Sequence, residues 1–228
     1  MKKNPLISVI ITYYKKKQFI EQTINSILSQ SYKNYELIFV YDDKEKNEIN
    51  FVKKILTKIK RKKIIINSKN LGVAQSRNIA IKKSKGMYLA FIDSDDLWKK
   101  NKLLNQINFM EKNSFYFSFT SYGIIDEKNK VIGERKAFFD ANYNNLYSSN
   151  FIGLNTVMIH KNLISKIFFP NLKTQEDYAL WLKLARKGLK LKHLNQNLSF
   201  WRKSKKSLSM NTFQKIIDAF KLYYIYEK

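Results

Sequence analysis

Apolar runs alternate with stretches of helical periodicity through the first half of the chain. The apolar runs, which are typical of buried parallel strands, cover 6–14, 35–41, 63–67 and 88–92. The segments between them, with apolar residues at helical spacing, cover 19–29, 49–59 and 72–83. This alternation predicts a doubly wound α/β sheet whose first half ends near Trp98.

The pattern is less regular after Trp98. Helices are predicted at 102–112 and 176–186, strands at 115–125, 131–132 and 155–160, and a strand or hairpin at 189–200. The segment 142–150 is polar and aromatic without periodicity, so we expect a mobile loop there. Residues 211–226 have the pattern of a basic, aromatic, amphipathic helix. We therefore expect one domain over 1–209, divided near residue 98, and a C-terminal helix at 210–228.

Composition excludes several classes of site. The 228 residues suffice for a single domain with a sizeable core. The absence of cysteine excludes disulfides, thiolate metal sites and a cysteine nucleophile, and two histidines are too few for a histidine metal site. No apolar run reaches the ~18 residues of a transmembrane helix, and the N-terminus does not resemble a signal peptide. We therefore expect a cytoplasmic protein.

The charge of the chain indicates an anionic partner. Forty-three Lys and Arg against 18 Asp and Glu give a formal net charge of +25. Nucleic acid, an anionic membrane surface and a negatively charged small substrate all fit this charge. The lysines are scattered, and no concentrated basic helix or strand pair with stacking aromatics is evident, which argues against nucleic acid.

Three aspartates follow the apolar run at 88–92. Asp93, Asp95 and Asp96 repel one another unless a cation or hydrogen-bond donors neutralise them. Asp93 and Asp95 project from the same side of an extended chain, as ligands of a hard divalent cation shared with a phosphate would. In open α/β sheets, ligands bind beyond the carboxyl ends of the strands. The alternative is that Asp95 or Asp96 simply caps a following helix.

Other candidate residues have weaker individual signals. Asp42 ends the second predicted strand and could accept hydrogen bonds from a base or ribose, or could simply form a turn. Arg77 follows Gly72 at a helix start and could bind phosphate, or could be an ordinary surface residue. Glu176 and Asp177 open a helix, where a carboxylate could act as a general base or merely favour the helix dipole. Neither a dinucleotide-binding glycine motif nor a P-loop is present.

Several segments occur in an order and spacing that resemble one enzyme family. They are 8–14, 29–42, 70–78, 93–98 and 176–183. Together they resemble the inverting family-2 glycosyltransferases of the GT-A fold, and the resemblance runs from about residue 6 to about residue 209. It implies transfer of a sugar from a nucleotide-diphospho-sugar, first of all a UDP-sugar, to a hydroxyl group. The implied acceptor is a glycan or a lipid-linked sugar, in cell-surface polysaccharide or lipooligosaccharide synthesis.

The resemblance also implies a role for each matching residue. Residues 1–98 would be the nucleotide-binding half and 99–209 the acceptor half. Asp95, with Asp93, would hold Mn²⁺ or Mg²⁺, and Asp177 would be the catalytic base with Glu176 beside it. The residues that would bind the donor are Thr12, Tyr14, Asp42, Arg77, Asp93 and Ser94, with Asp42 at the base and Arg77 near the diphosphate. The late segment 201–209 would close over the donor.

The chain departs from the family pattern at three places. The segment 12–14 stands where Pro-Thr-Tyr-Asn is typical, so the usual proline is missing. Asp43 replaces the glycine that usually follows the nucleotide-binding aspartate, and Ser204 occupies a position where histidine is common. These departures concern donor affinity and closure more than the fold.

Two other classes of function compete with sugar transfer. A sugar-nucleotide nucleotidyltransferase would also use metal and carboxylates, but it should carry a Gly- and Arg-rich loop after the first strand, which 13–17 does not provide. A non-catalytic basic binding protein, including an inactive relative, is the other class. The C-terminal helix could lie on anionic lipid at the inner membrane face through its aromatic residues and lysines, or pack its aromatics on the core.

Overall fold

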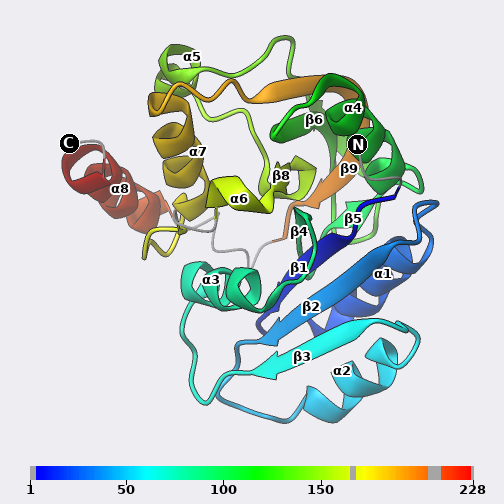
Figure 1. Cartoon of the computed structure of the whole chain (residues 1–228). Helices are drawn as coiled ribbons and strands as arrows, with labels where there is room; N and C mark the ends of the chain where they lie inside the picture. The colour runs from blue at the N-terminus through cyan, green and yellow to red at the C-terminus, as the bar shows by residue number, and fades with distance from the viewer. Residues whose placement is uncertain (1–3, 165–167, 205–211, 227–228) are drawn as a thin grey trace.

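A computed structural model describes residues 4–164, 168–204 and 212–226, and its described part contains a nine-stranded mixed sheet (Figure 1). The strand order is β3-β2-β1-β4-β8-β6-β9-β5, with β7 paired to β6. The parallel half consists of β1 (Ile7–Tyr13), β2 (Tyr35–Tyr41), β3 (Lys62–Ile66) and β4 (Tyr88–Asp93). The three inner strands are buried on both faces, which explains their near-continuous apolar sequences.

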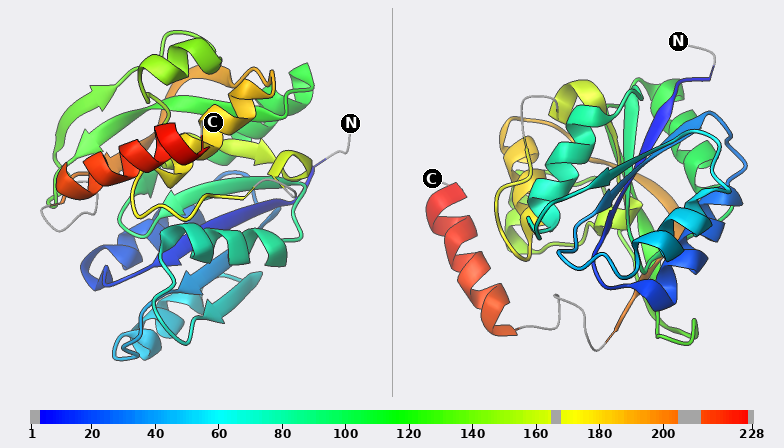
Figure 2. Two further views of the ribbon diagram at one scale, coloured as in Figure 1. Left: turned by 90° about the vertical axis from the view of Figure 1, so that its left-hand side faces the viewer. Right: turned by 90° about the horizontal axis from the view of Figure 1, so that it is seen from below.

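Two apolar clusters cover the opposite faces of this half-sheet, and helices lie over both faces (Figure 2). On one face, alternate side chains of β1 and β2 pack against α1 (Lys17–Leu28), α2 (Ile49–Leu56) and α4 (Lys102–Asn113). On the other face, the remaining side chains pack against α3 (Val73–Lys83) and α7 (Glu176–Arg186). This three-layer arrangement confirms the doubly wound α/β fold. Successive side chains of each strand point to opposite faces of the sheet, so each strand packs against both layers of helices.

The second half of the sheet reverses strand direction next to β4. β8 (Met158–His160) pairs antiparallel with both β4 and β6 (Phe117–Ile125), and β6 runs parallel to β9 (Lys192–Arg202). β7 (Val131–Arg135) is an exposed edge strand antiparallel to β6. β5 (Leu97–Trp98), which the sequence pattern did not predict, pairs with β9. That pairing places the chain immediately after the aspartates against the end of β9.

The structure corrects several sequence-based expectations, among them the start of the strand predicted at 155–160, since Leu154–Thr156 form a 3₁₀ turn and the strand covers Met158–His160. The segment 142–150 contains a short helix, α5 (Tyr143–Ser148), and not a loop. Asn142 and Asn145 each accept a hydrogen bond from the other's backbone N–H, a capping box that starts a helix without apolar periodicity. Asp95 and Asp96 do not cap the next helix either, since β5 follows them and Asn101 is the N-cap residue of α4.

Short elements complete the second half. A turn of 3₁₀ helix, η1 (Leu154–Thr156), precedes β8, and α6 (Lys161–Ile164) follows it. The helix α7 ends as predicted before Gly188, which adopts a positive φ of 82°. Its Trp181 packs edge-on against Phe117 of β6, with ring centroids 5.1 Å apart. This contact fixes α7 over the sheet.

The described part of the predicted C-terminal segment, 212–226, is helical, and residues 210, 211, 227 and 228 of that prediction lie outside the described residues. The helix consists of α8 (Thr212–Lys221) and a π-helical turn, η3 (Leu222–Tyr226), and lies at the periphery beside α7 (Figures 1 and 2). Asp218 is buried and accepts hydrogen bonds from the backbone N–H and the hydroxyl of Thr174 at 2.8 and 2.9 Å. Among the residues described, every helix falls short of the length and apolar character that crossing a bilayer requires.

Candidate active site

The carboxyl ends of β1, β2 and β4 meet at one edge of the sheet. The parallel register places Thr12 between Asp93 of β4 and Val40 of β2. The backbone N–H of Asp42 donates to the carbonyl of Tyr13 at 2.9 Å. Three of the predicted donor-site residues, Thr12, Asp42 and Asp93, are therefore neighbours although they are far apart in the sequence.

Asp42 organises the loop that leads into α3. It is buried, and its Oδ1 accepts hydrogen bonds from Asn67 Nδ2 and from the backbone N–H of Leu71, each at 2.8 Å. Its carbonyl accepts a third from Asn70 Nδ2 at 3.0 Å. Asp43, which stands where the family usually has glycine, forms an Asx turn. Its Oδ1 accepts a hydrogen bond from the Glu45 backbone N–H at 3.1 Å.

The turn after β1 presents different side chains to solvent and to the core. Tyr14 is 45% exposed at the edge of the site, and the Lys15 ammonium lies 5.5 Å from its ring centroid. Tyr13 points the other way and stacks on Tyr41, with ring centroids 5.3 Å apart. Thr12 and Tyr14 therefore flank the site, while Tyr13 belongs to the core.

The three aspartates after β4 occupy different environments. The side chain of Asp93 is 35% exposed and that of Asp95 is 12% exposed, whereas Asp96 is fully buried. Asp96 accepts from the backbone N–H of Arg202 at 2.9 Å and from Asn155 Nδ2 at 2.7 Å. Burial, followed by repulsion from Asp95, raises the pKa of Asp96 well above its usual value. Asp96 therefore anchors the loop, while Asp93 and Asp95 face the site. Ser94, another predicted donor-site residue, lies between them and is buried.

Arg202 and Asn155 hold the segment 93–96, called the aspartate loop below, against β9. Neither was predicted as an individual site residue. Arg202 Nε donates to the carbonyl of Asp95 at 2.7 Å, and its Nη2 donates to Gln22 Oε1 at 3.0 Å. For Arg202 the signal was its place at the start of the late motif at 201–209, of which residues 205–209 lie outside the described part. No sequence signal marked Asn155.

Lys16 neutralises Asp95. Its ammonium Nζ lies 2.6 Å from Asp95 Oδ2 and donates a hydrogen bond to Ser204 Oγ at 3.3 Å. Burial raises the pKa of Asp95, and the ammonium of Lys16 opposes that shift. Sequence reasoning missed Lys16 because it is one of three consecutive lysines with no distinguishing pattern.

Arg77 joins the aspartate loop to the start of α7. Its Nη2 lies 2.6 Å from Asp93 Oδ1, and its Nη1 forms an ion pair with Glu176 Oε1. The guanidinium is buried and lies over the ring of Phe169, 5.5 Å from the centroid. The family resemblance implies that Arg77 contacts the diphosphate region, and that role stays a prediction. In the structure its guanidinium lies between two carboxylates, Asp93 and Glu176.

Glu176 and Asp177 differ in accessibility although they are adjacent. Glu176 is buried against Arg77, and burial outweighs that cation and raises the pKa of Glu176 to about 7. Asp177 is half-buried, and its Oδ1 accepts from the backbone N–H of Tyr178 at 2.7 Å. Burial also raises the pKa of Asp177, again opposed by Arg77. Two carboxylates of raised proton affinity therefore begin α7, and Asp177 is the more accessible one.

The carboxylates fit a divalent cation only as a partial ligand set. Within the described ranges, no group of three or more His, Cys, Asp or Glu side chains is arranged to hold a metal ion. Asp93 and Asp95 nevertheless offer the hard oxygen ligands that Mg²⁺ and Mn²⁺ accept. A cation that takes its remaining ligands from phosphate oxygens and water fits this arrangement.

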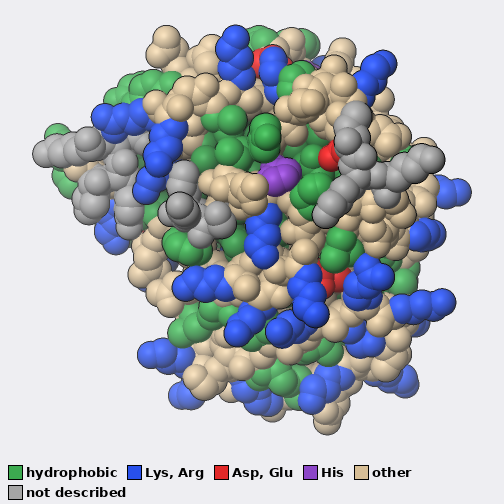
Figure 3. Space-filling model, viewed as in Figure 1, with side chains coloured by type: hydrophobic (Ala, Val, Ile, Leu, Met, Phe, Trp, Pro, Cys, Tyr) green, Lys and Arg blue, Asp and Glu red, His purple; other side chains and the backbone are tan. Residues whose placement is uncertain are grey.

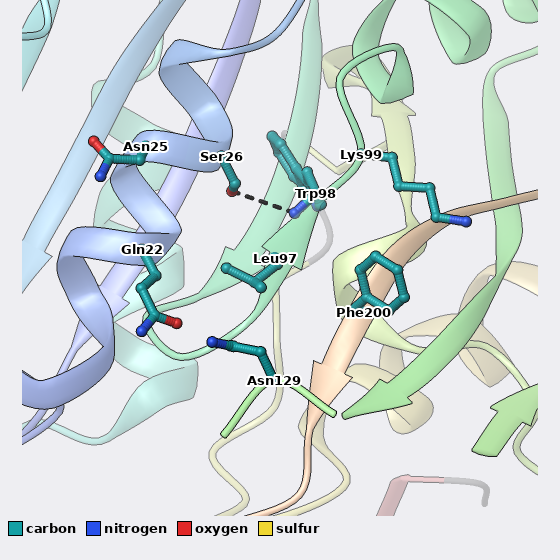
Figure 4. A pocket seen from close by; sticks show the side chains of 8 residues that line it. All are labelled: Gln22, Asn25, Ser26, Leu97, Trp98, Lys99, Asn129 and Phe200. Carbon is teal, nitrogen blue, oxygen red and sulfur yellow. Dashed lines mark hydrogen bonds between the residues drawn. The ribbon is translucent and has the colours of Figure 1, made fainter. Parts of the chain in front are cut away.

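A separate open cavity of about 490 Å³ lies between α1, β5 and β9 (Figure 4). Ser26 of α1 accepts a hydrogen bond from the Trp98 backbone N–H at 3.2 Å within it. The lining residues are Gln22, Asn25, Ser26, Leu97, Trp98, Lys99, Asn129 and Phe200. None of the predicted site residues lines this cavity, so the donor-site candidates belong to a different surface.

The overall arrangement is similar to that of solved glycosyltransferase structures. S. aureus TarS 1–349 in complex with UDP-GlcNAc superimposes with a TM-score of 0.75 at 20% identity, covering 90% of this chain and 61% of that one. Mannosyltransferase PcManGT from Pyrobaculum calidifontis, in complex with GDP-Man and Mn²⁺, has a TM-score of 0.75 at 13% identity, covering 97% and 64%. The chain thus spans about three-fifths of those structures. Both have the GT-A fold, which confirms the predicted fold class.

Sequence comparisons identify the family. The chain is 33% identical to the putative teichuronic acid biosynthesis glycosyltransferase TuaG of Bacillus subtilis, over 98% of this chain and 88% of that protein. It is 39% identical to WfaP of Escherichia coli, named a UDP-Glc:alpha-D-GlcNAc-diphosphoundecaprenol beta-1,3-glucosyltransferase, over 93% and 83%. The family model described as "Glycosyl transferase family 2" matches residues 8–169. The chain therefore belongs to glycosyl transferase family 2, as its motifs predicted.

Proposed function

We propose that this protein is an inverting transferase that moves a sugar from a nucleotide-diphospho-sugar, first of all a UDP-sugar, to a hydroxyl group of a glycan or lipid-linked acceptor. One observation carries the proposal: Arg77 joins Asp93, at the donor edge of the sheet, to the first turn of α7, where Asp177 lies. The carboxylates that would hold the metal ion of the diphosphate and the candidate base would then lie at the two ends of one ion-pair network. The name of WfaP includes UDP-Glc, and TarS was solved with UDP-GlcNAc.

In the proposed reaction, Asp177 removes the proton of the acceptor hydroxyl while the oxygen of that hydroxyl attacks the anomeric carbon of the donor sugar. The new glycosidic bond forms on the face of the sugar opposite the diphosphate. The bond between the anomeric carbon and the diphosphate oxygen breaks, and its electron pair stays on that oxygen. This single displacement inverts the anomeric configuration. A raised pKa suits Asp177 for the role, because a more basic carboxylate accepts a proton more readily.

Asp177 is a better candidate for the base than Glu176. The Glu176 carboxylate is buried in an ion pair with Arg77, which occupies Oε1 and holds the group away from solvent. The Asp177 side chain is half-buried at the same helix start. We assign Glu176 to positioning and Asp177 to proton transfer.

Asp93 and Asp95 would hold a Mn²⁺ or Mg²⁺ ion together with the diphosphate. When bound, such a cation neutralises charge on the leaving diphosphate. The PcManGT complex contains Mn²⁺ with its GDP-sugar, which supports this reading by likeness of fold alone. Thr12, Tyr14, Asp42 and Ser94 would complete the donor pocket around the nucleotide.

Nucleotide binding provides the direct test. Thermal unfolding should be measured with UDP, GDP, CDP and dTDP, each with and without Mn²⁺. A ligand present at one hundred times its dissociation constant stabilises the folded state by ~2.7 kcal/mol, which is a readily measured shift in Tm. A Mn²⁺-dependent shift with UDP alone supports the proposal. A shift with another nucleotide changes the donor, and no shift with any of them contradicts a nucleotide-sugar site.

We also propose peripheral association with the inner face of the membrane, through α8. Four apolar side chains, spaced so that they lie on one side of the helix, are exposed: Phe213 by 75%, Ile216 by 63%, Phe220 by 61% and Tyr224 by 57%. In the alternative, the aromatics of this helix pack on the protein, as Tyr223 does: its ring lies edge-on against Tyr147 with the centroids 5.2 Å apart. The exposure of Phe213, Phe220 and Tyr224 favours the membrane contact for these three. Lysine and arginine side chains are spread over the face of the molecule seen in Figure 3, with few acidic side chains among them, which favours anionic lipid.

A further inference from the structure

The ammonium of Lys16 forms an ion pair with Asp95, the carboxylate that the proposed function assigns to the divalent cation. Nζ lies 2.6 Å from Asp95 Oδ2, with the two side chains only 20% and 12% exposed. A hydrogen bond from Nζ to Ser204 Oγ, at 3.3 Å, fixes the ammonium from the β9 side. Ser204 is the residue that, by the resemblance noted above, stands where histidine is common.

The backbone around this ion pair is held on both sides. The carbonyl of Lys16 accepts from the N–H groups of Phe19 and Ile20 at 3.0 and 3.1 Å, the first hydrogen bonds of α1. Asp95 is fixed through its carbonyl, which accepts from Arg202 Nε at 2.7 Å. Both residues of the pair are therefore also held through their own backbone carbonyls.

The ammonium and a metal ion cannot both use Asp95 Oδ2. A Mg²⁺ ion lies about 2.0–2.1 Å from a carboxylate oxygen, close to where the ammonium now contacts the same atom. Two cations held that close repel strongly, and the mostly buried position of the pair weakens screening by water. Metal binding therefore requires Lys16 to leave Asp95.

We propose that Lys16 is a resident counter-ion of Asp95 that couples metal binding to donor binding. In the free protein it neutralises Asp95 and weakens binding of a metal ion alone. A nucleoside diphosphate brings negative charge to the same edge of the sheet, which gives the displaced ammonium a new partner. Metal and donor are then expected to load together, by the reciprocity of coupled binding. This inference rests on the metal site of the proposed function.

Mn²⁺ affinity, measured by electron paramagnetic resonance or calorimetry on the full chain with and without UDP, tests the coupling. Lys16→Met should bind Mn²⁺ alone at least about fivefold more tightly than the native protein, and UDP should increase its Mn²⁺ affinity less. Lys17→Met is the matched control, since it removes the same charge one residue away, where Nζ lies over the Phe51 ring at 5.3 Å. Lys16→Arg should keep the native behaviour.

The outcomes separate this inference from the metal site itself. If the native protein binds Mn²⁺ with UDP and Lys16→Met behaves like Lys17→Met, the coupling is wrong while the metal site stands. If neither the native protein nor Lys16→Met binds Mn²⁺ in the presence of UDP, the metal site of the proposed function is wrong, and this inference fails with it. Asp95→Asn removes the shared carboxylate, so adding Lys16→Met to that variant should leave its Mn²⁺ affinity unchanged.

Discussion

Arg77 and Glu176 form a buried ion pair that connects α3 to the first residue of α7. The same guanidinium reaches Asp93 at the end of β4, so one side chain ties together three elements from both halves of the chain. Burial lowers the pKa of Arg77, but the neighbouring carboxylates outweigh it, so its pKa is raised overall and the charge is retained. Arg77 thereby sets the distance between the aspartate loop and the candidate base.

Replacing Arg77 by alanine should lower the free energy of unfolding by about 3–5 kcal/mol, because it leaves a buried carboxylate without its counter-ion. Arg77→Lys should recover only part of this loss, since an ammonium cannot reproduce the guanidinium's simultaneous contacts with two carboxylates. Urea unfolding monitored by tryptophan fluorescence is the measurement. Arg61→Ala, at an exposed arginine, is the control and should cost less than about 1 kcal/mol.

Asp177→Asn should retain donor binding and lose about 10²–10⁴-fold in kcat, because the amide cannot accept the acceptor proton. Steady-state transfer should be measured alongside the affinity for UDP, which separates chemistry from binding. Glu176→Gln is the matched neighbour and should retain more of the turnover. Retention of turnover by Asp177→Asn with loss in Glu176→Gln would exchange the two roles.

The stability of the protein should depend on pH through Glu176. Its pKa is raised from 4.5 to about 7 in the folded state, so the folded protein binds an additional proton between those values. This contribution to stability is fully present below the unfolded pKa and is lost as pH rises toward 7. Unfolding of the native protein and of Glu176→Gln should be compared across this window, and the difference should change with pH. A constant difference would show that Glu176 does not titrate there.

Asn155→Ala should loosen the aspartate loop. The substitution removes the 2.7 Å hydrogen bond to buried Asp96 and should cost about 1–3 kcal/mol, with weaker UDP binding as a second effect. Asn105→Ala removes an exposed hydrogen bond of 2.8 Å from the side-chain amide of Asn105 to Gln196 Oε1, and it serves as the control. Equal effects of the two substitutions on stability and on UDP affinity would argue against a loop-holding role for Asn155.

The double substitution Phe213→Ser and Phe220→Ser should weaken sedimentation with vesicles that contain anionic lipid, because it removes apolar area from the exposed side of α8. Phe138→Ser alters a side chain that is 79% exposed elsewhere and is the control. Added salt should weaken binding of the native protein by screening its lysines. Equal binding by the double variant and the control would exclude α8 as the contact.

Local sequence was sufficient for most of the fold. Strands such as β2 and helices such as α7 were predicted near their observed bounds, because buried parallel strands and amphipathic helices impose strong apolar patterns. The helix α5 and the strand β5 were not predicted. The first depends on side-chain caps, and the second consists of two residues whose pairing partner, β9, lies about a hundred residues away.

The candidate site divides in the same way. Strand ends and motif order located Asp42, Asp93, Asp95 and Asp177, because the carboxyl ends of parallel strands and a helix start have recognisable local patterns. Which charges pair with which could not be read from the chain. Arg77 lies between two carboxylates, Lys16 contacts Asp95, and Asp96 is buried against Asn155, since ion pairs depend on distances between segments that only packing brings together.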